Sequence, residues 1–326
     1  MNIFKNKNIL ITGGLGFIGS NLARRLLGLG AEVTLIDSLI PEYGGNLFNI
    51  SDIKDRVHVN ISDVRDEHSM RYLVQDQDYL FNLAGQTSHM DSMQDPFTDL
   101  DINCSAQLSL LETCRKYNSD IKVIFASTRQ IYGKPDYLPV DEDHPIRPVD
   151  VNGINKTAGE WYHLLYNNVY GIQTSVLRLT NTYGPGMRVK DARQTFLGIW
   201  VRLLLEEKPF EVWDGDQLRD FTYVDDAVEA FLLTAKNDVA NGKVYNLGGE
   251  CNISLKDLAN LLIEVNGGGE YILKIYPSER KRIDIGDYYA DISRIQNELG
   301  WNPSVPLKEG LAKTLHYYQK NHLNYW

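Results

Sequence analysis

The sequence predicts an α/β fold in which a doubly wound parallel sheet is joined to a smaller C-terminal domain. Through the first half of the chain, short apolar segments alternate with amphipathic segments of helical length. The apolar segments carry few polar residues on either face, which is typical of strands covered by helices on both sides. Beyond residue 180 the alternation becomes irregular, which indicates a second structural unit.

The elements of the first half can be assigned in chain order. Apolar segments that we predict to be strands lie at 8–14, 32–37, 56–63, 79–85, 122–128 and 173–181. Amphipathic segments that we predict to be helices lie at 17–30, 97–117 and 157–171, and Gly30 is a natural stop for the first. We place the domain boundary near residue 180, with domains 1–180 and 181–326. No low-complexity linker separates them, so we expect the two to interleave.

Composition excludes several classes of protein. The 326 residues are 43% hydrophobic and 23% charged, as in ordinary globular proteins, and no apolar run reaches the roughly 18 residues of a membrane span. The formal net charge of −10 argues against binding nucleic acid. Cys104, Cys114 and Cys251 are scattered and odd in number, which disfavours a disulfide framework and a zinc site. We therefore expect a cytoplasmic protein without a metal centre.

A glycine motif directly after the first predicted strand indicates a dinucleotide site. In "ITGGLGFIGSNL", Gly13, Gly16 and Gly19 recur at intervals of three. The first glycine permits a tight turn, the second lets the backbone approach a pyrophosphate, and the third allows close packing of helix on strand. Phe17 and Ile18 begin the helix, whose free N–H groups and positive dipole end suit phosphates. We expect these five residues to contact the cofactor.

The ends of the following strands complete the predicted cofactor site. Asp37 ends the second strand about 20 residues after the glycines, where a carboxylate holds the adenine ribose hydroxyls. The same charge repels a 2′-phosphate, so NAD is favoured over NADP. Asp63 and Val64 follow the third strand, where adenine is expected. Leu83 and Ala84, after the fourth strand, are the last residues of this set.

At this point the chain resembles a known family, the extended short-chain dehydrogenase/reductases that act on nucleotide sugars. The resemblance runs nearly end to end, through "ITGGLGFIGSNL", "FASTRQIYG", "NGINKTAGE", "LRLTNTYGPG", "RDFTYVDDAVEA" and "LGWNPSVPLKEGL". It implies an NAD-binding Rossmann domain with a smaller domain for the sugar nucleotide. It also implies bound NAD that takes a hydride from a sugar carbon and later returns it.

The same resemblance identifies an unusual active-site helix. The family places a catalytic tyrosine four residues before a lysine, on one helix face. In "NGINKTAGE" Lys156 is present, but the tyrosine position holds Asn152. A carboxamide has no proton that it can exchange near neutral pH. Asn152 is thus expected to orient the sugar hydroxyl, while another group accepts its proton.

Several groups are candidates for this missing base. The resemblance places Thr128 at the nicotinamide beside the reacting hydroxyl, and Tyr132 lies further along the same segment. His89 follows the fourth strand, and histidine has a suitable pKa. Lys156 itself, if desolvated, and a water relay through Thr128 and Asn152 are further alternatives. The residues leave this choice open.

Basic and polar residues in the second half indicate the sugar-nucleotide site. Asn181, Arg219 and Arg282 match family positions that contact the nucleotide or its diphosphate, and guanidinium groups fit phosphate oxygens bidentately. Arg188 lies in a basic loop that we expect to close over the substrate. The resemblance also implies a homodimer formed through long helices, with Trp161, Leu164 and Leu165 exposed.

Three functions are compatible with these features. The favoured one is an NAD-dependent nucleotide-sugar epimerase. Dehydratases and decarboxylases of the family carry acidic residues where Arg129 and Gln130 stand here, so either activity would require relocated acid/base groups. The third is a protein that binds NAD and nucleotide sugar with little turnover, an alternative that Asn152 favours and the predicted diphosphate clamp opposes.

Overall fold

The computed structural model describes residues 2–277 and 281–326. Its largest sheet has seven parallel strands in the order β10-β6-β5-β4-β1-β2-β3. The strands are β1 (Asn8–Thr12), β2 (Glu32–Asp37), β3 (His58–Ile61), β4 (Tyr79–Asn82), β5 (Lys122–Thr128), β6 (Thr174–Leu179) and β10 (Val244–Asn246). The predicted α/β fold with a doubly wound parallel sheet is therefore confirmed.

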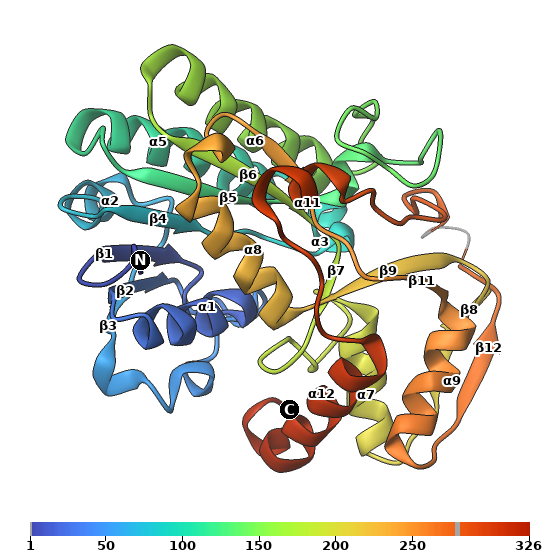
Figure 1. Cartoon of the computed structure of the whole chain (residues 1–326). Coiled ribbons are helices and arrows are strands. Elements are labelled where there is room, and N and C mark those ends of the chain that lie inside the picture. Colours follow the sequence, from blue (N-terminus) through green and yellow to red (C-terminus); the bar gives the residue numbers. More distant parts are fainter. Residues whose placement is uncertain (1, 278–280) are drawn as a thin grey trace.

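Helices cover both faces of this sheet (Figure 1). One apolar cluster joins the sheet to α2 (Glu67–Leu73), α5 (Ala106–Tyr117) and α6 (Val151–Tyr170). A second, larger cluster joins the opposite face to α1 (Phe17–Gly28) and α8 (Val224–Lys236), and continues into the C-terminal region. The amphipathic pattern of these segments is thus explained by burial against the sheet.

The C-terminal region is built around two small sheets. Strand order is β11-β9-β7 in one and β12-β8 in the other. The strands are β7 (Asn181–Tyr183), β8 (Phe210–Trp213), β9 (Leu218–Tyr223), β11 (Asn252–Ser254) and β12 (Tyr271–Lys274). The accompanying helices are α7 (Phe196–Leu205), α9 (Leu255–Asn266), α11 (Ser293–Leu299) and α12 (Leu307–Asn321).

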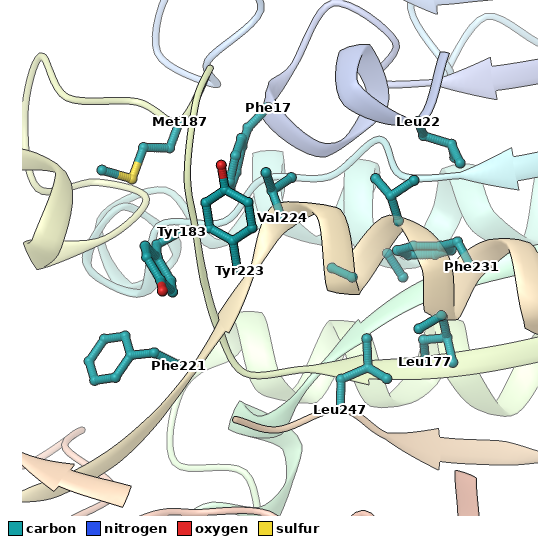
Figure 2. Packing of buried hydrophobic residues seen from close by; sticks show 14 of the residues in the cluster. Phe17, Leu22, Leu177, Tyr183, Met187, Phe221, Tyr223, Val224, Phe231 and Leu247 are labelled. Carbon is teal, nitrogen blue, oxygen red and sulfur yellow. The ribbon is translucent and has the colours of Figure 1, made fainter. Parts of the chain in front are cut away.

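The two halves of the chain share one continuous core. Figure 2 shows Phe17 of α1 beside Tyr223 and Val224, which lie at the junction of β9 and α8. In addition, β10 pairs with β6 in the large sheet although it comes from the second half of the chain. The chain therefore crosses between the two units more than once, and a boundary at residue 180 stays a prediction.

One predicted helix contains a wider turn. The segment 97–117 forms α4 (Pro96–Leu100), a π-helical turn (Asp101–Ser105) and then α5. Asp99 and Asn103 in this segment are fully buried and hydrogen-bonded to each other. The wider π turn is of the kind often found near functional sites. Among the described residues, none of the helices combines the length and apolarity that a membrane crossing requires.

Candidate active site

A cleft follows the carboxyl-terminal ends of the strands in the large sheet. The residues predicted to hold the dinucleotide all line it: Gly13, Gly16, Phe17, Ile18, Gly19, Asp37, Asp63, Val64, Leu83, Ala84 and Lys156. Thr128, Asn152, His89 and Asn181 also line it. Parallel strands end at the same edge of a sheet, so residues far apart in the sequence meet there.

The β1–α1 turn leaves room for a ligand beside its middle glycine. Gly13 has a φ of +67°, and a Cβ added at Gly19 would lie 2.3 Å from the carbonyl oxygen of Gly13. Both glycines are therefore required by the protein itself. At Gly16 an added Cβ would meet only that same oxygen, at 3.1 Å. Gly16 begins α1 without a side-chain cap and without an acidic residue in the first turn, which fits a pyrophosphate.

Two carboxylates lie at the adenosine end of the cleft. Asp37 accepts hydrogen bonds from the backbone N–H groups of Leu15 (3.1 Å) and Leu39 (2.9 Å). Burial raises the pKa of the Asp37 carboxyl, although these two bonds oppose the change. The hydrogen bonds from Arg65, at 2.9 and 2.7 Å, lower the pKa of Asp63 despite partial burial. The glycine turn and Asp37 together fit an NAD-type dinucleotide.

Lys156 is a buried cation at the other end of the cleft. Its side chain extends from α6, and Nζ donates to the backbone oxygen of Ala126 at 3.1 Å and lies 4.9 Å from the ring centre of Phe125. Burial lowers the pKa of Lys156 to about 8, and the attraction of Asp99 opposes this only in part. A Cβ added at Gly85 would lie 2.9 Å from Nζ, so glycine makes room for the ammonium group.

Asn152 lies one turn before the lysine, and its amide is committed to neighbouring groups. Nδ2 donates to the backbone oxygen of Gln86 (2.8 Å) and to the carboxyl group of Asp99 (3.0 Å). Asp99 also accepts bonds from Asn103 (3.0 Å) and Asn155 (2.8 Å). Three carboxamides therefore satisfy one fully buried carboxyl group, which would otherwise be costly to bury. Asn152 therefore stabilises the buried Asp99 through its amide and also lines the cleft.

The end of β5 contributes a hydroxyl and a guanidinium group. Thr128 Oγ1 accepts the N–H of Gln130 at 3.2 Å and so caps the short helix Arg129–Tyr132. Arg129 Nη2 donates to Asn181 Oδ1 at 2.9 Å. Burial, aided by repulsion from Arg219, lowers the pKa of Arg129 to about 10. This group therefore remains a cation near neutral pH.

His89 is the first residue of α3 (His89–Gln94) and contacts a buried carboxylate. Its Nδ1 lies 3.0 Å from Oδ2 of Asp150. Asp150 precedes α6, accepts the backbone N–H of Gly153 (2.6 Å), and accepts an amide hydrogen bond from Gln130 (2.8 Å). The imidazole is 39% exposed and lines the cleft, whereas the carboxylate behind it is buried.

Tyr132, proposed from the sequence as a candidate base, is not brought to the cleft. The residue is fully buried, and its phenol donates to Asn246 at 2.7 Å and accepts a hydrogen bond from Arg178 at 2.6 Å. Burial raises the pKa of this phenol well above its usual value. Its ring packs in a separate small core with Tyr288 and Val140, so the structure contradicts a direct proton-transfer role.

A second cleft adjoins the first and is built largely from the C-terminal region. Arg219 lines it, is 6% exposed, and donates to the backbone oxygens of Leu218 (2.9 Å) and Gly286. Asn181 donates to the backbone oxygen of Asp220 at 2.9 Å. The residues that line both clefts are His89, Arg129, Asn181, Gln194 and Thr195. These residues mark the place where the two clefts meet.

Two predicted substrate contacts do not line either cleft. The guanidinium group of Arg188 donates hydrogen bonds to Asp191, at 2.8 and 2.6 Å, and to the backbone oxygen of Pro41 at 2.7 Å. These contacts stabilise the loop that carries Arg188. Arg282 is exposed, although its neighbours Ile283 and Asp284 line the second cleft. Arg193, from the same loop as Arg188, does line it.

Sequence reasoning missed three residues that hold the site together. The carboxyl group of Asp99 accepts hydrogen bonds from three carboxamides, and Asp150 contacts His89. The third residue is Gln86, whose backbone oxygen accepts hydrogen bonds from Asn152 and Asn103. One signal was available for Asp150, because an aspartate immediately before a helix is a typical N-cap. Asn103 lies only four residues after Asp99, but Asn152 and Asn155 are too distant in sequence for a local pattern to reveal them.

The comparisons with known proteins agree with this geometry. Residues 10–314 match the family described as GDP-mannose 4,6 dehydratase. A putative UDP-glucose 4-epimerase of Methanocaldococcus jannaschii is 34% identical over 317 residues, covering 96% of this chain and 99% of the relative. A UDP-glucose 4-epimerase of Thermotoga maritima, solved with UDP-glucose, has a TM-score of 0.89 and 31% identity, with 97% of this chain and 99% of that chain covered.

A dehydratase is similar as well. The dTDP-glucose 4,6-dehydratase of Streptomyces venezuelae, solved with NAD and TYD bound, has a TM-score of 0.88 and 25% identity, with 97% of this chain and 98% of that chain covered. The matches span nearly the whole chain and extend over both clefts. This chain therefore belongs to the family of NAD-dependent nucleotide-sugar epimerases and dehydratases.

Proposed function

We propose that this protein is an NAD-dependent nucleotide-sugar epimerase, which changes the configuration of a sugar ring carbon through a keto intermediate. The observation that carries the proposal is the junction of the two clefts. A cleft that fits a dinucleotide meets an arginine-lined cleft at His89, Arg129 and Asn181. A sugar lying at this junction would have its ring beside the reactive end of the cofactor and its diphosphate toward Arg219.

The dinucleotide end supports NAD as the cofactor. Gly16 gives the pyrophosphate access to the start of α1, and Asp37 would hold the adenine ribose hydroxyls. Asp63, Val64, Leu83 and Ala84 would enclose the adenosine, and Lys156 would hold the nicotinamide ribose. When bound, NAD supplies the hydride acceptor and donor that redox isomerisation requires.

The chain's own residues would position the alcohol and stabilise charge. Thr128 would donate or accept a hydrogen bond at the reacting hydroxyl, and Asn152 would stand where a tyrosine is usual in this family. The ammonium group of Lys156 would stabilise negative charge that develops on the sugar oxygen. Since Asn152 Nδ2 is already bonded to Gln86 and Asp99, only its carbonyl oxygen is available to the substrate.

Epimerisation is favoured over dehydration by the residues that follow Thr128. Dehydration requires a group that removes a carbon-bound proton and another that protonates the leaving hydroxyl. Arg129 remains a cation, and the Gln130 amide is bonded to Asp150. The similarity to a dehydratase keeps that reaction as the second candidate. A binding protein without turnover is the third, and Arg219, which we propose to hold the diphosphate, argues against it.

The proposed substrate is a nucleotide-diphosphate sugar, and the proposed assembly is a homodimer. Arg219 and Asn181 would contact the diphosphate and nucleotide. The dimer is supported by an apolar surface along α4 and α6, where Phe97, Trp161 and Leu165 are 75%, 58% and 48% exposed. A second copy of the same surface would bury these side chains, and light scattering of wild type and Trp161→Glu would test the assembly.

Incubation with a panel of UDP-, GDP-, CDP- and dTDP-sugars tests the function. Epimerisation predicts a new sugar isomer by NMR together with a small steady fraction of NADH absorbance. Loss of water or carbon dioxide from the sugar would instead support a dehydratase or decarboxylase. Tight binding of NAD and nucleotide sugar without any conversion would contradict an enzymatic role.

A further inference from the structure

His89 and Asp150 form a close contact in which the position of each residue is set by a different helix. The two residues come from different elements, α3 and the segment before α6, and their side chains are 3.0 Å apart at Nδ1 and Oδ2. Ser88 caps α3 by accepting the N–H of Asp91 at 3.1 Å. The position of the histidine is therefore fixed by its own helix, and the position of the aspartate is fixed by the start of α6.

Asp150 is held from three directions and has no contact with solvent. Its carboxylate accepts hydrogen bonds from the N–H of Gly153 and the amide of Gln130, and His89 Nδ1 lies 3.0 Å from Oδ2 in a contact that lacks hydrogen-bond alignment. Burial raises the pKa of the Asp150 carboxyl, but the contact with His89 and these two hydrogen bonds outweigh burial and leave it below its usual value. An ionised carboxylate only accepts hydrogen bonds. A carboxylate 3.0 Å from Nδ1 favours the neutral imidazole that carries its proton on Nδ1, and in that tautomer Nε2 has a free lone pair.

The location of His89 separates it from the other candidates for proton transfer. Of the described residues that line both clefts, Arg129 is a permanent cation, Asn181 and Gln194 are amides, and Thr195 is a hydroxyl that caps α7. Only the imidazole among these five belongs to a residue type that exchanges a proton near neutral pH. Lys156 lines the dinucleotide cleft but is absent from the lining of the second cleft.

We propose that His89, oriented by Asp150, is the group that accepts and returns the proton of the sugar hydroxyl in place of the family's tyrosine. This inference rests on the proposed epimerase function. Nε2 takes the hydroxyl proton, the O–H electron pair becomes the second bond of the ketone, and the C–H pair leaves as a hydride to oxidised NAD. The return step reverses each transfer on the other face of the carbon. His89 is the catalytic residue, and Asp150 is a positioning residue.

Other charged groups near the imidazole do not duplicate this arrangement. Asp91, on the same helix, forms an ion pair with Arg193 at 3.1 Å. Arg129, at the junction of the clefts, donates to Asn181. Asp150 is therefore the carboxylate that the structure places against the ring, while Arg129, Arg193 and Lys156 supply positive charge around the cleft.

Two substitutions test the pair without removing its packing. His89→Gln keeps an amide that can donate to Asp150 but cannot exchange a proton. Asp150→Asn keeps a good helix cap, since asparagine and aspartate are similar at this position, but removes the charge. His68→Gln, at an exposed histidine of α2, is the matched control. Bound NAD content and the Kd for UDP confirm that each variant is folded with its clefts intact.

We expect His89→Gln to lower kcat by about 10²–10⁴-fold, the usual contribution of a general acid–base group, with little change in KM. The acidic limb of the pH–kcat profile should disappear in this variant. In Asp150→Asn the kcat should also fall while the KM stays close to that of wild type, because the carboxylate no longer favours the tautomer with a free lone pair on Nε2. His68→Gln should match wild type in both respects.

A measurement that does not require turnover completes the test. In ¹⁵N-histidine NMR spectra, the resonance that disappears in His89→Gln should show protonated Nδ1 and unprotonated Nε2. Asp150→Asn should shift this resonance toward the mixture of tautomers seen for exposed histidines. An Nε2-protonated ring, or a ring insensitive to Asp150→Asn, would overturn the proposed pair.

The outcomes also separate this inference from the proposed function. If wild type converts a nucleotide sugar and His89→Gln does so at the same rate with the same pH profile, the acid–base assignment is wrong and epimerisation stands. If wild type converts no sugar of the panel, the epimerase proposal and the catalytic role of His89 both fail. The NMR spectra then show whether the oriented pair itself exists.

Discussion

The two ends of the dinucleotide cleft are constructed in different ways. The end where we propose the pyrophosphate to bind, called here the pyrophosphate end, is a single turn of backbone in which Gly13 and Gly19 are required by packing and Gly16 has open space beside it. The end where we propose the proton transfer, called here the acid–base end, is assembled from side chains on four separate segments, around 86–89, 99–103, 126–130 and 150–156. The first end depends on the absence of a side chain at each glycine, and the second end depends on a buried network of polar side chains.

The two ends therefore differ in how well they tolerate substitution. A glycine turn tolerates almost no substitution, because any side chain meets backbone or ligand. A side-chain network can exchange one member when its neighbours still satisfy every buried polar group. Asn152 illustrates this, since its amide is needed by Asp99 and Gln86 whatever its role toward substrate. The substitutions below test the contrast, beginning with the largest expected effect.

Among the substitutions that compare the two ends, loss of the buried ammonium group of Lys156 should have the largest effect on catalysis. We expect Lys156→Met to lower kcat by about 10²–10³-fold, comparable to the loss of one preorganised hydrogen-bond donor at a developing oxyanion. Lys122→Met is the matched control, because Lys122 is also buried but contacts Asn237 and Asp238 at the opposite end of β5. Wild-type turnover in Lys156→Met would show that the site has been placed wrongly.

The same lysine should make stability depend on pH. Its folded-state pKa of about 8 lies below the usual 10.5, so the unfolded chain binds more protons between these two values and stability rises with pH across that window. Relative to Lys156→Met, the NAD-free wild type should gain up to about 3 kcal/mol from pH 8 to 10.5, at 1.36 kcal/mol per unit. Urea unfolding of both proteins measures this difference, and a parallel pH dependence would contradict the buried charge.

The glycine turn should separate folding from cofactor binding. Gly19→Ala places a Cβ 2.3 Å from the carbonyl oxygen of Gly13, so we expect it to destabilise the protein by about 1–3 kcal/mol, as for other overpacked sites. Gly16→Ala should remain folded but raise the Kd for NAD by about tenfold, equivalent to 1.4 kcal/mol. Gly28→Ala, in open space at the end of α1, is the control. Equal NAD affinity in Gly16→Ala and wild type would argue against pyrophosphate at this turn.

Two asparagines that share one carboxyl group allow the most selective test. Asn152 and Asn155 both donate to Asp99, but only Asn152 lines the cleft. Each alanine variant should lose about 1–3 kcal/mol of stability, because a buried acceptor loses a donor. Only Asn152→Ala should also change the KM for the nucleotide sugar. Equal effects of the two variants on KM would restrict Asn152 to a structural role.

The sheet and the glycine turn after its first strand could be predicted because both depend on local patterns. Strands β1 and β5 contain continuous apolar runs, and the glycines follow β1 directly. The π-helical turn within the helix over 97–117 could not be predicted in this way. It places Asp99 and Asn103 inside the protein to meet Asn152 and Gln86, and those partners come from other segments of the chain.

The acid–base end and the substrate contacts were predicted only in part for the same reason. His89 was identified by residue type, but its partner Asp150 became visible only once the segment before α6 was placed against α3. Tyr132 and Arg188 have side chains of the type expected for proton transfer and for diphosphate binding. However, Tyr132 is hydrogen-bonded to Asn246, and Arg188 is hydrogen-bonded to Asp191. A motif fixes which residues are near a site, whereas the direction of each side chain depends on contacts between distant segments.

The proposed reaction removes a hydride from a sugar carbon in this cleft and returns it to the same carbon. The most direct measurement uses a nucleotide sugar fully deuterated on its ring carbons, incubated with the wild-type protein in ordinary water. Our account predicts a product of inverted configuration that retains deuterium at the inverted carbon, because the hydride never exchanges with solvent. Inversion with loss of that deuterium to water would contradict the account, as would the absence of any conversion.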